Sequence, residues 1–188
     1  MRDLSLHILD IVQNSIAARA SIINIHISID SEREYLILSV YDNGSGMDSD
    51  YTVKAQDPFV TSRTTRKVGL GIPLLKESAL KCNGNFNIIS KKNKGTKIIA
   101  AFSINHIDRL PIGEIGETLV AAISANAHTT FILELNSEKG CFKLSTEEVA
   151  KNLEGVPINE YEVLKWLKGY IDEGIKNIFG GVLNEVDS

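Results

Sequence analysis

The chain has 188 residues, 43% hydrophobic and 23% charged, a composition typical of a globular protein with a substantial core and long enough for one domain with an appendage. Its net charge of −4, with 14 acidic against 7 basic side chains in residues 106–188, argues against nucleic acid as a partner. No apolar run reaches the roughly 18 residues of a membrane span, no signal peptide is evident, and two cysteines make no disulfide framework, so we expect a reduced, cytoplasmic protein without a membrane partner.

The first elements alternate between helical and strand patterns. Residues 3–20 repeat apolar side chains at helical spacing and predict a helix. Residues 22–30 and 35–42 are rich in β-branched and aromatic side chains and are separated by the polar "SERE", which predicts an antiparallel pair of strands. Residues 48–68 form a long polar segment without clear periodicity.

A second helix is predicted from about residue 71 to 81, with Pro73 tolerated in its first turn. Two strands follow, "NFNIIS" and "TKIIAAFSI", around the basic turn "KKNKG". Beyond residue 105 we expect a helix over 115–126 and a hairpin over 129–145. Two capping boxes then predict two more helices: Ser145 with Glu148, and Asn159 with Glu162.

A narrow polar stripe runs along the first predicted helix. Asp3, His7, Asp10 and Asn14 are spaced by four, three and four residues, so they share one face. The stripe has two interpretations, a solvated helix face or a site for hydrated Mg²⁺, which takes few protein ligands, all of them oxygen.

Two glycine-containing motifs bear on ligand binding. "VGLGI" joins the basic, hydroxyl-rich "TSRTTRK" to a helix start, where free N–H groups and the helix dipole favour phosphate; a glycine pair that merely eases a loop into a helix is the alternative. "YDNGSGM" follows a strand without a convincing return strand for a hairpin. Its aspartate could instead accept a hydrogen bond from an exocyclic amine.

The order of these motifs is more specific than any one of them. "LDIVQNSIAA", "DNGSGM", "DPFVTSR", "GLGI" and "GT" follow one another within residues 1–105, and this succession resembles the Bergerat-fold ATP-binding domain of gyrase, Hsp-type chaperones, sensor histidine kinases and mismatch-repair ATPases. The resemblance implies a two-layer α/β sandwich with a mixed, mostly antiparallel sheet, helices on one face, and ATP with Mg²⁺ as cofactors.

The resemblance also implies site residues. Asn14 would hold Mg²⁺, Asp10 would activate water as the catalytic residue, and Asp42 would bind the adenine amine. The other expected nucleotide-binding residues are Gly44, Gly46, Met47, Arg66, Lys67, Gly69, Leu70, Gly71 and Thr96.

Departures from the family pattern leave the activity open. Asp10 is one methylene shorter than the usual glutamate, Ala17 replaces a charged residue, and no phosphoacceptor helix is expected ahead of the domain. The resemblance therefore implies a stand-alone histidine-kinase-like ATPase with slow hydrolysis or phosphotransfer to a separate protein. The alternative is a non-catalytic, ATP-dependent protein-binding regulator similar to anti-sigma factors.

Residues 106–188 resemble no family that we can name, and we expect an α+β extension of unknown role. It could extend the sheet, cover the open face of the sheet, or form a dimer or partner surface. The expected partners are ATP or ADP and a protein of unspecified identity, with a homodimer left open.

Overall fold

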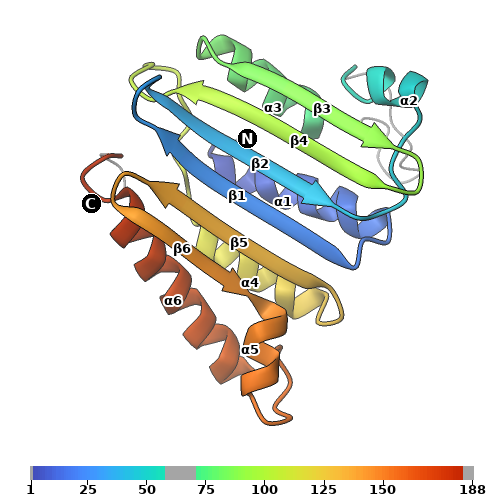
Figure 1. The fold of residues 1–188 in the computed structure, drawn as a ribbon, viewed down its shortest axis with the longest axis vertical. Coiled ribbons are helices and arrows are strands. Elements are labelled where there is room, and N and C mark those ends of the chain that lie inside the picture. Colours follow the sequence, from blue (N-terminus) through green and yellow to red (C-terminus); the bar gives the residue numbers. More distant parts are fainter. Residues whose placement is uncertain (1, 58–70, 184–188) are drawn as a thin grey trace.

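The computed structural model describes residues 2–57 and 71–183. Within these ranges lie six helices and six strands (Figure 1). In chain order they are α1 (Leu4–Ala17), β1 (Ile22–Asp30), β2 (Tyr35–Asp42), α2 (Ser49–Lys54), α3 (Gly71–Lys81), β3 (Asn85–Lys91), β4 (Gly95–Ser103), α4 (Ile115–Ala125), β5 (Thr130–Ser137), β6 (Gly140–Ser145), α5 (Thr146–Asn152) and α6 (Tyr161–Phe179).

The six strands form one mixed sheet in the order β3-β4-β2-β1-β5-β6. Every neighbouring pair is antiparallel except β1 with β5, which run parallel. A parallel pair needs a crossover connection, and the chain makes it through the elements between β1 and β5, ending in α4. The predicted α/β sandwich with a mixed, mostly antiparallel sheet is confirmed.

One face of the sheet carries the core. Strand β1 alternates strictly, with Ile23, Ile25, Ile27 and Ile29 buried, because successive side chains of a strand point to opposite faces. Helices α1, α3 and α4 lie behind this face and α6 lies along its β6 end, while the other face is open toward the viewer (Figure 1). None of the described helices is long and apolar enough to cross a membrane.

The segment after residue 105 extends the same sheet, one of the roles left open for it, and also holds the first helix. Strands β5 and β6 add to the β1 edge. The backbone N–H groups of Leu4 and Ser5 donate to the carbonyls of Pro111 and Ile112 at 2.9 and 3.1 Å. These bonds satisfy donors that the first turn of a helix cannot pair internally. The position of α1 therefore depends on residues beyond the expected boundary at 105.

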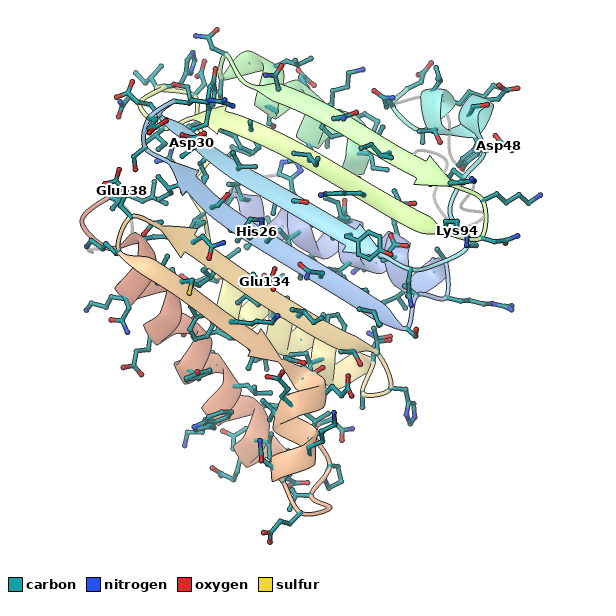
Figure 2. The ribbon with its side chains drawn as sticks, viewed as in Figure 1. His26, Asp30, Asp48, Lys94, Glu134 and Glu138 are labelled. Carbon is teal, nitrogen blue, oxygen red and sulfur yellow. The ribbon has the colours of Figure 1, made fainter. Side chains whose placement is uncertain are left out.

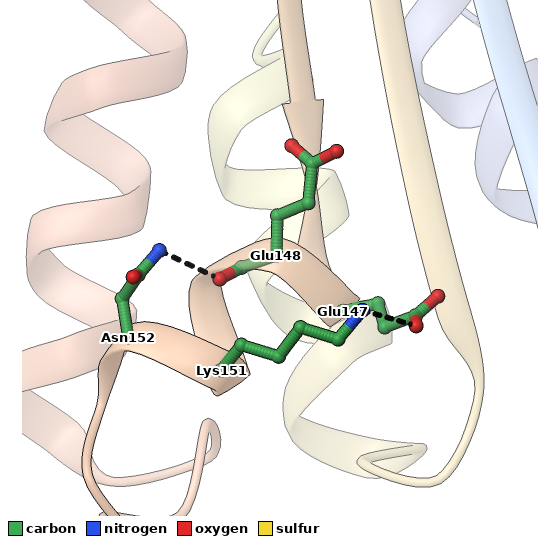
Figure 3. A network of polar contacts seen from close by, with 4 residues as sticks. All are labelled: Glu147, Glu148, Lys151 and Asn152. Atoms are coloured by element: carbon green, nitrogen blue, oxygen red, sulfur yellow. Dashed lines mark hydrogen bonds and ion pairs between the residues drawn. The ribbon is translucent and has the colours of Figure 1, made fainter.

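Helix α5 is stabilised at the surface. Lys151 Nζ lies 2.7 Å from Glu147 Oε1, and Asn152 Nδ2 donates to the Glu148 carbonyl at 2.9 Å (Figure 3). The ion pair joins residues four apart on one helix, and both side chains are exposed. Exposed pairs of this kind contribute little to stability, so this network supports a short helix and does not form a site.

Three local expectations are wrong. The polar segment 48–68, in which no helix was expected, contains the short helix α2 within its described residues, and Asp48 caps it by accepting from Tyr51 N–H at 2.8 Å. Ser145 is the N-cap of α5 but makes no side-chain cap bond. Helix α6 begins with Glu160 as its N-cap, so the predicted capping box one residue earlier does not form.

Candidate functional site

The helix-facing side of the sheet becomes polar at one end. Strand register places Ser90 of β3 opposite Thr96 of β4, and Thr96 opposite Asp42 of β2. The next row inward on the same face is Ile88, Ile98 and Val40, all buried. A carboxylate and two hydroxyls thus replace the apolar row where β2 ends and β4 begins. Figure 2 labels Asp48 and Lys94 at this end of the sheet.

The carboxylate of Asp42 is buried, with 5% of the residue exposed. Ser15 Oγ donates to Asp42 Oδ2 at 2.8 Å, and the Gly44 N–H donates to Asp42 Oδ1 at 2.9 Å. Together the two bonds fix the orientation of the carboxylate. Each carboxylate oxygen has room for a second hydrogen bond, so Asp42 can still accept from a donor such as an exocyclic amine.

The loop after β2 is held between two turns. The Ser45 N–H donates to the Ala18 carbonyl at 2.9 Å, and the Ser45 carbonyl accepts from Asn93 N–H at 2.6 Å. Asn43 Oδ1 accepts from the N–H groups of Ser21 and Ile22, each at 2.9 Å. The loop therefore has a fixed position between the end of α1 and the β3–β4 turn.

Close packing explains why glycine stands in this region. Gly46 has φ +60° and Gly95 has φ +94°, backbone conformations that favour glycine. A β-carbon at Gly46 would overlap the Lys91 carbonyl, and one at Gly95 would overlap the Asp42 carbonyl. At Gly44 it would lie 2.8 Å from the Ala18 carbonyl oxygen. These glycines bring three backbone segments together around Asp42.

The polar residues of α1 lie beside the start of α3. Asp10 and Asn14, one turn apart, are both half-buried. A β-carbon at Gly71, the first residue of α3, would lie 3.0 Å from Asp10 Oδ2. The carboxylate thus sits against the N-terminus of α3, where anions are favoured by the helix dipole.

His7 belongs to the packing of α1. It is 1% exposed, and within the described residues neither ring nitrogen has a hydrogen-bond partner. Burial lowers the pKa of His7 to about 4, against a smaller raising effect of the Asp3 carboxylate. The ring is therefore neutral at pH 7. Asp3 itself caps α1 through the Leu6 N–H at 3.0 Å, so the predicted stripe has one capping, one buried and two half-buried members.

Four expected nucleotide-binding residues, Arg66, Lys67, Gly69 and Leu70, lie outside the described residues. Other expected positions come together at one end of the sheet and on the two adjacent helices. At the end of the sheet lie Asp42, Gly44, Gly46, Met47 and Thr96, and on helices α1 and α3 lie Asp10, Asn14 and Gly71. The described residues contain no group of three or more His, Cys, Asp and Glu side chains able to hold a metal ion. Hydrated Mg²⁺ needs only a few protein ligands, all of them oxygen.

A polar hollow of about 430 Å³ occupies the open face of the sheet and is separate from this site. His26 and Glu134 lie side by side there, on neighbouring strands (Figure 2). A hydrogen bond from Lys143 lowers the pKa of Glu134, and Asn136 pairs with His26 at 2.9 Å. The sheet itself divides this hollow from Asp42 and α1.

Sequence reasoning missed two serines of the site. Ser15 is buried and donates a hydrogen bond to Asp42. The sequence feature that could have indicated it is a hydroxyl side chain within the apolar stripe of α1, one turn after Ile11. Ser90 lies 2.9 Å from Thr96 Oγ1, and its signal was its place opposite Thr96 across the predicted hairpin. Neither serine stands out without the fold, because serine is common on strands and helices.

Comparison with known proteins gives a family match and many similar solved structures. The model of the family described as "Histidine kinase-, DNA gyrase B-, and HSP90-like ATPase" matches residues 2–106. A crystal structure of the N-terminal domain of a DNA repair protein is similar at 17% identity with a TM-score of 0.49, over 77% of this chain and 52% of that one. This chain thus spans about half of that structure. No curated protein matches the sequence.

Proposed function

Because this chain belongs to the histidine kinase-, DNA gyrase B- and HSP90-like ATPase family and contains its ATP-binding domain over residues 2–106, we propose that it is a Mg-ATP-dependent enzyme. It hydrolyses ATP slowly or transfers the phosphoryl group to a separate protein. The observation that supports this proposal most strongly is the close contact between Asp10 and Gly71, the first residue of α3. Asp10 lies one helical turn from Asn14 on α1.

The base end of the proposed site rests on Asp42. Its buried carboxylate has a fixed orientation, held by Ser15 and the Gly44 N–H, and it retains acceptor capacity for an adenine amine. Met47 is half-buried beside this region and packs against the core, which suits a soft apolar contact with a purine ring. The residues present therefore fit a nucleotide base.

The phosphate end rests on α1 and α3. Asn14 offers an amide oxygen, the ligand type that Mg²⁺ takes in proteins, and the bound metal would neutralise phosphate charge. Asp10 would act as the general base for an attacking water. Both residues belong to one helix, so their relative geometry is rigid. Gly71 keeps the N-terminus of α3 close to Asp10.

A regulator without catalysis is the second candidate. One observation favours it: Trp166 and Tyr170 of α6 stack in parallel with centroids 5.2 Å apart, and are 53% and 39% exposed. Exposed aromatic pairs are characteristic of protein interfaces. In this case ATP would set the affinity for a partner, and Asp10 would contribute only to binding.

Steady-state hydrolysis by the Asp10→Asn variant separates the two functions. The substitution keeps size and polarity but removes basicity. If the protein is an enzyme, the rate falls by about 10²-fold or more, the usual scale for a general base, while ATP affinity stays within a few-fold. Asp30→Asn, at the opposite end of β1 (Figure 2), is the matched control and should keep the wild-type rate. Wild-type hydrolysis at background would favour the regulator, and an unchanged rate in Asp10→Asn would exclude Asp10 as the base.

A further inference from the structure

The hydroxyl of Ser90 meets three polar groups at the end of the sheet. The Met47 N–H donates to Ser90 Oγ at 2.8 Å, and Ser90 Oγ donates to the Gly95 carbonyl at 3.1 Å. Thr96 Oγ1 lies 2.9 Å away. Ser90 thus links the loop after β2, the β3–β4 turn and the threonine that faces Asp42.

Counting protons identifies the donor in the hydrogen bond between Ser90 and Thr96. A serine hydroxyl has one proton and two lone pairs. The Met47 N–H can only donate, so it occupies one lone pair of Ser90 Oγ. The Gly95 carbonyl can only accept, so it takes the hydroxyl proton of Ser90. The bond with Thr96 must then use the second lone pair, and the proton comes from Thr96.

This assignment leaves Thr96 Oγ1 as an acceptor. Its own proton is engaged by Ser90, so only lone pairs remain for a ligand. Thr96 and Asp42 are opposite one another on neighbouring strands, where side chains on one face lie about 5 Å apart. This end of the sheet therefore presents two acceptors together, the carboxylate of Asp42 and the hydroxyl oxygen of Thr96.

We propose that Ser90 is a specificity-determining residue, which holds Thr96 as an acceptor beside Asp42 so that the proposed base site selects an exocyclic amine over a ring carbonyl. The inference rests on the proposed function as an ATP-binding enzyme. Ser90 acts through Thr96 and is a positioning residue. Adenine offers an amine at its 6-position, whereas hypoxanthine and guanine carry a carbonyl oxygen there, which two acceptors repel.

The test compares the affinities of ATP and inosine triphosphate by calorimetry in Mg²⁺ buffer. The wild type should prefer ATP. In Ser90→Ala the Thr96 proton becomes free to donate to a carbonyl, so the preference for ATP should fall by about fivefold or more, the scale of one hydrogen bond. Ser90→Thr keeps the hydroxyl and should restore the preference. Ser28→Ala, on the open face of β1, should leave it unchanged.

The ratio of the affinities for ATP and inosine triphosphate distinguishes a loss of specificity from a general loss of structure. If Ser90 only supports the loop and turn, Ser90→Ala weakens both nucleotides equally and the ratio stays at the wild-type value, which overturns the inference. A Thr96→Val background adds a second check: removing Ser90 there should change the ratio no further. If Ser90→Ala does not fold, Ser90→Cys keeps the size with a weaker hydrogen-bonding group, and an unchanged ratio in that variant overturns the inference.

Failure of the inference is distinguishable from failure of the proposed function. A wild type that binds neither nucleotide contradicts the proposed function itself. A wild type that binds ATP and inosine triphosphate equally leaves ATP binding intact but contradicts the selectivity assigned to Ser90 and Thr96.

Discussion

Ser15 on α1 and Asp42 at the end of β2 are joined by a hydrogen bond of 2.8 Å from Ser15 Oγ to Asp42 Oδ2. Both residues are buried, at 2% and 5% exposure. The same helix carries Asp10 and Asn14, so this bond links the helix that would serve the phosphates to the carboxylate that would bind the base. The two ends of the proposed ATP site are therefore held in one rigid arrangement.

Replacing either partner should weaken ATP binding to different degrees. Asp42→Asn removes a charged acceptor and should reduce the binding free energy by about 1–3 kcal/mol, the range for a charge-assisted bond. Ser15→Ala leaves the carboxylate in place and should cost about 1 kcal/mol. Calorimetry in Mg²⁺ buffer measures both, with Asp30→Asn as the control. Wild-type affinity in Asp42→Asn would remove this residue from the base site.

The proposed metal role of Asn14 predicts an effect that depends on Mg²⁺. Asn14→Ala should weaken ATP binding in Mg²⁺ buffer, with a much smaller loss once the metal is chelated, because only the metal-linked contact disappears. Gln13→Ala, an exposed amide on the same helix, should have little effect in either buffer. An equal loss with and without Mg²⁺ would return the polar stripe of α1 to the solvated-face interpretation.

Substituting two glycines that both have positive φ should distinguish the effect of steric overlap from the effect of backbone strain. Gly140, the first residue of β6, has φ +132° and no atom of the described residues within 4 Å of an added β-carbon, whereas at Gly95 the β-carbon would overlap the Asp42 carbonyl. Gly140→Ala should cost about 1–3 kcal/mol of stability from strain alone. Gly95→Ala should cost more and should also weaken ATP binding, because Asp42 must move. Urea unfolding and calorimetry measure the two effects, and equal stability with unchanged affinity would contradict this role of Gly95.

Buried His7 predicts acid lability. Its pKa is lowered from 6.5 to about 4 in the folded protein, so between these values the unfolded state binds more protons. Stability is therefore fully present above about pH 6.5 and falls as the pH drops toward 4, by roughly 3 kcal/mol in total. His7→Leu should flatten this part of the urea-unfolding profile, whereas substitution of exposed His128 by Gln should not. An equally steep loss in His7→Leu would show that carboxylates dominate.

The boundary expected at residue 105 can be tested by truncation. A fragment of residues 1–105 lacks β5, which pairs along β1 from Ile22 to Ser28, and lacks the carbonyls that accept from Leu4 and Ser5. It should unfold at lower urea concentration than the full chain and bind ATP more weakly, because α1 loses its anchor. A fragment as stable as the full chain would support an independent domain ending at 105.

The sequence by itself determined the order of the described elements and all of them except the short helix α2. Alternation in residues 22–30 and 35–42 predicted β1 and β2 at their observed bounds, and the glycine at residue 71 marked the start of α3, because side-chain periodicity is a local property of the chain. The motif order also indicated the ATPase family, to which residues 2–106 belong. Local signals failed at the capping boxes, since Asn159 and Glu162 fit the pattern but tertiary packing starts α6 at Tyr161.

Only the tertiary structure decided which polar groups meet. Ser15 and Asp42 are 27 residues apart, and Ser90 meets Met47 from 43 residues away, distances across which no spacing rule operates. The same holds for the parallel pairing of β5 with β1, which joins the acidic C-terminal segment to the ATPase sheet. Hydrogen-bond direction and burial depend on strand register and helix docking, and these arise only when segments remote in sequence pack together.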